Sequence, residues 1–218
     1  MPRSLLIAEF LLLFVVLPLL YRFSPLRAPV LPVLWALSGY AVWQLLRDPR
    51  FERTQLWNLG ALTRHVGPML AIFAVAALVL WAGVHRFAPG IKWSLVRRRP
   101  VLWAIVMIAY PILSVYPQGL LYRAFFFERY QTLFPAGWPM ILASAAAFGF
   151  MHIIFRNPLA PALTLVGGAL FAFRYAQTGS LAASSFEHAL YGCWLFSLGL
   201  GGYFYHGTIA SVETLLRK

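Results

Sequence analysis

Long uncharged stretches constrain this chain more than any other feature of its sequence. Val66–Val84, Val101–Gln118 and Gln131–Met151 contain no Asp, Glu, Lys or Arg. About 20 helical residues cross the hydrocarbon core of a bilayer, and each stretch is close to that length. Over the 218 residues, 61% are hydrophobic and 11% are charged, which excludes an ordinary soluble domain. We therefore predict an integral membrane protein.

Turn and breaker residues divide the chain into about seven to eight predicted membrane helices. The start resembles a secretory signal, but it lacks a small-residue cleavage pattern, so we expect an uncleaved first helix. Pro117 is expected to end one helix, and the next begins at Gln118. The predicted helices are 1–23, Ala28–Leu46, Val66–Val84, Val101–Tyr116, Gln118–Leu133, Pro139–Phe155, Pro161–Ala176 and Leu181–Tyr205. This pattern predicts an all-α, polytopic membrane helical bundle with a single domain over residues 1–218.

Basic residues gather between the apolar segments. Lys and Arg number 18 and Asp and Glu number 6, with clusters at Arg47–Arg53 and Arg97–Arg99. Such clusters are typical of loops that touch anionic lipid, and Arg47–His65 is expected to be a loop at the membrane interface. We expect membrane lipid as a partner and no nucleic acid, because no solvated domain carries a basic patch. The first three loops are all basic, so charge does not fix the orientation.

A small set of polar side chains falls within the predicted membrane helices. They are Gln118, Arg123, Glu128, Arg129, His152, Arg174, Glu187 and His188. Such groups cost free energy in hydrocarbon, so they usually face one another or a wet cavity. We interpret Arg129 and Arg174 as side chains whose charged ends reach the interface. Arg123, His152 and His188 are expected to share a polar cavity.

Three short motifs on separate predicted helices resemble those of a known family. The motifs are Gln118-Gly119-x-x-x-Arg123, Phe148-x-x-x-His152 and His188-x-x-x-Gly192, in that order. They are similar to Glu-Glu-x-x-x-Arg, Phe-x-x-x-His and His-x-x-x-Asn or Asp in the CAAX protease and bacteriocin-processing (Abi) family of intramembrane endopeptidases. The resemblance covers about residues 100–205. It implies a cavity within the bilayer in which a motif-one glutamate activates water for attack on a peptide bond.

The first and third motifs depart from the family pattern. Gln118 and Gly119 stand where the family has glutamates, and Gly192 stands where it has Asn or Asp. A glutamine cannot take up a proton as a base, and a glycine has no side chain. The resemblance implies catalytic positions at Gln118, Gly119, Arg123, His152 and His188, with supporting positions at Phe148, Glu187 and Gly192.

Two other acids lie near the motifs in the sequence. Glu187 neighbours His188, but adjacent residues of a helix point about 100° apart. Glu128 lies about 15 Å along the helix from Gln118, at a rise of 1.5 Å per residue. Neither acid is expected to replace the missing glutamate.

Metal dependence stays open at this point. His152 and His188 are the candidate ligands if a divalent metal such as zinc is bound. Cys193 is the single cysteine, so no zinc-type cysteine spacing exists.

Two functions stay open. The resemblance implies a CAAX-protease-like intramembrane endopeptidase that acts on membrane-anchored or leader-peptide substrates. The alternative is a catalytically inactive relative that acts as a membrane binding or regulatory protein. A small transporter is a third interpretation, but two similar halves are not visible. The resemblance also implies a multi-pass protein of the bacterial inner (plasma) membrane whose partner is a membrane-anchored protein or peptide.

Overall fold

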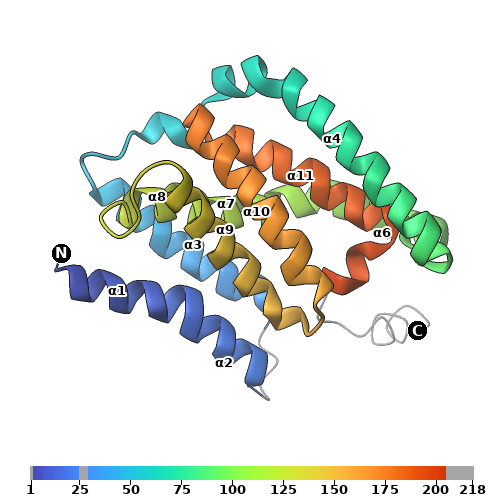
Figure 1. Ribbon diagram of the computed structural model, residues 1–218, viewed down its shortest axis with the longest axis horizontal. Coiled ribbons are helices and arrows are strands. Elements are labelled where there is room, and N and C mark those ends of the chain that lie inside the picture. Colours follow the sequence, from blue (N-terminus) through green and yellow to red (C-terminus); the bar gives the residue numbers. More distant parts are fainter. Residues whose placement is uncertain (1, 25–28, 205–218) are drawn as a thin grey trace.

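The fold is a bundle of helices. The computed structural model describes residues 2–24 and 29–204, and every regular element in these ranges is helical (Figure 1). In chain order the α-helices are α1 (Arg3–Leu11), α2 (Leu17–Phe23), α3 (Val30–Arg47), α4 (Leu59–Phe87), α5 (Ser94–Arg98), α6 (Pro100–Tyr110), α7 (Tyr116–Gly119), α8 (Phe126–Arg129), α9 (Trp138–Met151), α10 (Leu159–Thr178) and α11 (Leu181–Leu198). The predicted helix start at Ala28 and the predicted helix end at Tyr205 lie outside the described residues.

The all-α membrane class is confirmed. Five helical stretches in the described ranges are long and apolar enough to cross a membrane. They are Arg3–Phe23, Arg53–Phe87, Pro100–Arg129, Trp138–Phe155 and Leu159–Thr178. The predicted number of seven to eight membrane helices is not confirmed, because five stretches in the described ranges are that long and apolar.

Pro117 does not end a helix, contrary to the prediction. α6, α7 and α8 belong to one continuous helix, Pro100–Arg129, and π-helical segments at Pro111–Val115 and Leu120–Phe125 join them. A proline ring crowds the carbonyl four residues earlier in an α-helix. The wider π-helical turns relax such crowding, and they occur mostly as single turns within α-helices. The motif-one residues therefore lie in the second half of one long helix and not at a helix start.

α4 begins earlier than predicted. The Asn58 side chain accepts a hydrogen bond from the Ala61 backbone N–H at 3.1 Å and caps the helix. A cap of this kind satisfies one of the free N–H groups of the first turn. The part of the predicted interface loop from Leu59 to His65 is consequently helical, and a 3₁₀ turn, Arg53–Leu56, precedes it.

α11 lies at the centre of the bundle, between α4 and α10 (Figure 1). α9 packs along α10, where Gly149 and Gly168 allow the two backbones to approach. A Cβ atom at Gly149 would lie 3.1 Å from the Leu165 Cα, and one at Gly168 would lie 3.3 Å from the Ala145 Cα. These contacts hold α9, which carries Phe148 of the second motif, against α10, which carries Arg174.

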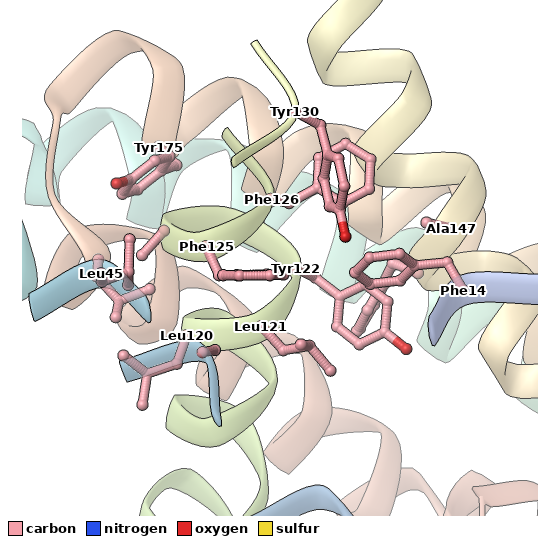
Figure 2. Packing of buried hydrophobic residues seen from close by; sticks show 14 of the residues in the cluster. Phe14, Leu45, Leu120, Leu121, Tyr122, Phe125, Phe126, Tyr130, Ala147 and Tyr175 are labelled. Atoms are coloured by element: carbon pink, nitrogen blue, oxygen red, sulfur yellow. The ribbon is translucent and has the colours of Figure 1, made fainter. Parts of the chain in front are cut away.

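The N-terminal helix docks onto the motif-one helix through aromatic rings. Figure 2 shows Phe14 beside Tyr122, Phe126 and Tyr130, with ring centroids 5.4, 5.2 and 5.8 Å from that of Phe14. Each pair is tilted edge to face, which is the favoured geometry of aromatic contacts. This cluster fixes the side of the helix that carries Tyr122 against the N-terminal helix.

An ion pair continues the same contact. Arg129 donates to Glu9 through Nε at 3.0 Å and Nη2 at 2.7 Å, and the Tyr130 hydroxyl donates to Glu9 at 3.2 Å. The interpretation of Arg129 as a side chain whose charged end reaches the interface stays a prediction. Its charge is balanced by an acid on α1.

Candidate functional site

A cavity of about 1640 Å³ lies between α3, α4, α6, α9, α10 and α11. Most of its wall consists of apolar side chains. The polar residues in the wall include Tyr110, Ser114, Gln118, His152 and His188. None of the described residues that line the cavity is an Asp or a Glu. A large apolar pocket with a few polar groups is the usual form of a ligand site.

His152 is placed by the end of α9, where the helix tightens into the 3₁₀ turn His152–Phe155. Its Nδ1 lies 2.7 Å from the Phe148 carbonyl oxygen. A carbonyl only accepts, so Nδ1 carries the hydrogen, and in the neutral ring the lone pair is on Nε2. The turn ends at Arg156, which adopts a left-handed conformation with φ 60°. The second motif thus presents an imidazole in one defined tautomer.

His188 lies on α11 and is held between aromatic rings of α9 and α10. Its ring stacks on Phe171 at 4.6 Å and 18°, and it meets Phe148 at 5.4 Å and 87°. Phe148 also contacts His152 at 4.7 Å. The motif phenylalanine therefore lies against both histidines. The His188 Nε2 is 3.4 Å from the Tyr110 hydroxyl.

Arg123 is in a different place from the one expected. Its side chain is 1% exposed and is not part of the cavity wall. The guanidinium carbon lies 4.3 Å from the Phe148 ring centroid and 5.5 Å from that of Phe171. None of its three side-chain nitrogens has a hydrogen-bond partner in the described part of the chain. The cation is therefore held by aromatic faces, which attract it electrostatically.

The two motif-one positions face different surroundings. Gln118 lines the cavity, donates from Nε2 to Ser114 Oγ at 2.7 Å, and has no partner for its buried Oε1 among the described residues. Gly119 faces α11, where an added Cβ would lie 2.8 Å from Leu181 Cδ1 and 2.9 Å from Ser185 Oγ. Position 118 is therefore the motif-one position that reaches the cavity directly.

Glu187 is fully engaged elsewhere. Its two carboxylate oxygens accept from Arg174 Nε at 2.8 Å and Nη2 at 3.0 Å, and Arg174 Nη1 donates to Gln177 at 2.7 Å. The carboxylate is 0% exposed and the guanidinium side chain 3%. The interpretation of Arg174 as an interface residue is therefore wrong, because it is the buried partner of Glu187. Glu187 is therefore not available as a base in the cavity. This agrees with the expectation that Glu187 and His188, as adjacent residues of a helix, point in different directions.

Glu128 also lies away from the cavity. It accepts a hydrogen bond from Gln131 at 3.2 Å at the end of the motif-one helix and does not line the cavity wall. This position agrees with the expectation that Glu128 does not replace the missing glutamate of motif one.

Several polar residues of the cavity wall lie outside the three motifs, among them Tyr110 and Ser114. Tyr110 and Ser114 precede Gln118 at intervals of four residues on the same long helix. Residues four apart lie on one helical face. This spacing, counted back from the first motif, is the signal by which the sequence could have pointed to them.

The described residues do not fit a divalent metal. No group of three or more His, Cys, Asp or Glu side chains within residues 2–24 and 29–204 could hold one. Zinc sites in proteins use three or four such ligands, and His152 and His188 supply two.

Comparison with known families gives one match. Residues 99–194 match the family described as type II CAAX prenyl endopeptidase Rce1-like. No match was found among the curated proteins or among the solved structures. The matched range contains all three motifs, from Gln118 to Gly192. The resemblance to the CAAX protease family that the motifs predicted is thus confirmed over residues 99–194, and this part of the chain is similar to that family of membrane endopeptidases.

Proposed function

We propose that this membrane protein binds a membrane-anchored peptide in its cavity and does not hydrolyse it. One observation carries the proposal. The cavity retains His152, His188 and the cavity-facing position of motif one, but none of its described wall residues is an acid. A glutamine at position 118 keeps one acceptor oxygen of a glutamate, carries an NH2 donor in place of the other, and cannot take up a proton.

The remaining wall chemistry suits recognition. Gln118 offers a buried carbonyl oxygen that has no partner in the described ranges, and the neutral His152 ring offers Nε2 as an acceptor. Acceptors of this kind can hold the N–H groups of a peptide. The surrounding apolar wall suits a lipid anchor or apolar side chains, because buried apolar area provides most of the affinity in such pockets.

The membrane and the partner belong to the same proposal. We place the protein in the plasma membrane of a bacterium and take its partner to be a lipid-anchored protein or a peptide leader. The family match supports a membrane location, and the apolar cavity supports a lipid-anchored partner. Membrane fractionation of the source cell tests the location, and crosslinking from a photoreactive side chain introduced at the cavity wall tests the partner.

Binding is tested with purified protein in lipid nanodiscs and a fluorescent peptide that carries a lipid anchor. The parent is expected to bind the probe and leave it intact. His188→Ala should weaken binding about tenfold, which is the loss expected for a buried polar contact. His85→Ala is the matched control, because His85 is exposed and does not line the cavity. Equal affinity of parent and His188→Ala would contradict binding in this cavity.

Hydrolysis is tested by restoring a carboxylate. Gln118→Glu replaces an amide with a carboxylate of the same size at the cavity wall, whereas Gly119→Glu must first displace Leu181 and Ser185. Cleavage that begins with Gln118→Glu and stops again with His188→Ala would support a binding protein derived from an enzyme. Cleavage by the parent that depends on His188 would refute the proposal.

The second candidate function is endopeptidase activity of the parent chain. The observation in its favour is the hydrogen bond from His152 Nδ1 to the Phe148 carbonyl, which leaves Nε2 of a neutral ring free to act as a general base. Under this alternative the parent cleaves the probe and His152→Gln abolishes cleavage. The same assay therefore separates the two functions.

A further inference from the structure

Tyr110 and Gly192 fit together across two helices. Gly192 lies one turn after His188 on α11, and both line the cavity. A Cβ atom at position 192 would overlap the Tyr110 ring and hydroxyl, with the ring Cζ only 2.6 Å away. Ring atoms of Tyr110 cannot move aside as the end of a flexible chain can. The glycine is therefore required for the tyrosine to occupy this place.

Packing explains the ring of Tyr110 but not its hydroxyl. The ring meets Phe196 edge to face at 5.1 Å, a contact that a phenylalanine would make equally well. The hydroxyl is 3.4 Å from His188 Nε2, its hydrogen-bond partner in the described part of the chain. A phenol can donate and accept at once, so it can contact both the imidazole and a ligand.

The hydroxyl also continues a polar line along the cavity wall. Tyr110, Ser114 and Gln118 lie on one face of the long helix, and Gln118 donates to Ser114 at 2.7 Å. This line connects the first motif with His188. Its other neighbours in the wall are mainly apolar, so these groups are positioned to bind the polar part of a ligand.

We propose that Tyr110 supplies, from α6, the polar group that α11 lacks at position 192. Its hydroxyl and His188 together form the pair that hydrogen-bonds a peptide group of the bound ligand. The second half of this statement rests on the proposed function, whereas the pairing of Tyr110 with His188 holds in the ligand-free protein. Tyr110 is thus a recognition and positioning residue outside the three motifs.

The pairing is tested without ligand by NMR of protein labelled with ¹⁵N-histidine in nanodiscs. The His188 ring signals are assigned by their loss in His188→Gln. Tyr110→Phe should shift the His188 Nε2 signal and leave that of His152 in place. Tyr175→Phe is the matched control, because its hydroxyl bonds Gln55 at 2.8 Å and does not line the cavity. An unchanged His188 signal in Tyr110→Phe would overturn the pairing.

Recognition is tested by exchanging the two side chains. Tyr110→Phe should weaken binding of the lipid-anchored peptide probe about two- to tenfold, the range for one hydrogen bond. Tyr110→Ala removes the ring as well as the hydroxyl, and adding Gly192→Asn returns a polar side chain from α11. The double variant should recover affinity relative to Tyr110→Ala. A folded double variant without recovery would overturn the exchange.

The two experiments separate the two proposals. If the parent does not bind the probe, the proposed function fails, and the NMR experiment still decides the Tyr110 pairing. If the parent binds and Tyr110→Phe binds equally well, recognition by Tyr110 is refuted and the proposed function stands.

Discussion

Two buried arginines of this protein have opposite surroundings. Arg174 on α10 is 3% exposed and meets both oxygens of Glu187. Arg123 on the motif-one helix is 1% exposed and has only the rings of Phe148 and Phe171 against its guanidinium. No hydrogen-bond partner for its side-chain nitrogens exists within the described ranges. The same side chain thus has an ionic partner in one place and aromatic faces in the other.

The two arginines differ in how the free-energy cost of burying their charge is offset. An arginine in the middle of a membrane helix costs roughly 2.5 to 3.5 kcal/mol on insertion scales. A hydrogen-bonded carboxylate offsets this cost for Arg174, so the pair with Glu187 holds α10 to α11. Cation–π contact offsets part of it for Arg123, at about 2 kcal/mol when desolvated. The positions one turn before Arg123, where an acid would balance its charge, are Gln118 and Gly119.

The largest expected effect is on the paired arginine. Glu187→Leu leaves the Arg174 charge buried without its carboxylate, and breaking a buried pair in this way costs about 3 to 5 kcal/mol. Unfolding of the purified protein in detergent measures the loss. The double variant Arg174→Met with Glu187→Leu should recover most of it. A double variant as unstable as the single one would show that the charges are not the reason.

Replacing the unpaired arginine, Arg123, should raise the free energy of unfolding, whereas breaking the Arg174 pair lowers it. Arg123→Met removes a buried cation without an acid partner and keeps apolar contact with Phe148 and Phe171. We expect unfolding stability to rise by about 1 kcal/mol, the insertion cost less the cation–π contact. The same unfolding assay checks it. A loss of stability would reveal a partner for Arg123 and would remove the contrast with Arg174.

The pair of Glu9 and Arg129 is partly exposed, and we expect its loss to have a smaller effect on stability than the loss of the buried Arg174 pair. The Arg129 and Glu9 side chains are 24% and 13% exposed. Glu9→Gln removes the charge and one of the two acceptor oxygens, so we expect a loss of up to about 1 kcal/mol that shrinks in high salt. The effect is measured by unfolding at low and high ionic strength. A loss as large as that of Glu187→Leu would contradict the dependence on burial.

The smallest effect is expected at the loop pair of Asp48 and Arg50. Hydrogen bonds from the Arg50 side chain and backbone lower the pKa of Asp48 from 3.8 to about 2. A lowered carboxyl pKa adds stability above the ordinary value, and this is lost as the pH falls toward 2. We expect no difference between parent and Asp48→Asn in the pH dependence of unfolding from pH 7 to 5, and a small one below pH 4. A difference that starts near pH 6 would contradict this assignment.

Helix positions could be predicted only in part from the sequence. The apolar stretches and the break between the predicted helices Pro139–Phe155 and Pro161–Ala176 indicated the course of the chain, because hydrophobic length and breakers are local signals. The uninterrupted helix through Pro117 was not predictable in the same way, since π-helical turns depend on the surrounding packing. The start of α4 was also missed, although Asn58 is a common capping residue.

The residues of the candidate site were also predictable only in part from the sequence. Motif spacing located His152, His188 and Gln118, which the structure brings to one cavity wall. The position of Arg123 behind aromatic rings, and the fit of Tyr110 against Gly192, depend on contacts between helices far apart in the sequence. Such contacts leave no local pattern for a sequence to display.

The sequence by itself determined a membrane helix bundle and the resemblance of its motif region to the CAAX protease family, because apolar length and motif spacing are properties of short segments. It also determined that no glutamate stands in the first motif. The tertiary structure alone decided which charges are balanced, since that depends on which helix faces meet. Packing places Glu187 against Arg174 and leaves the cavity wall, among the described residues, without an acid.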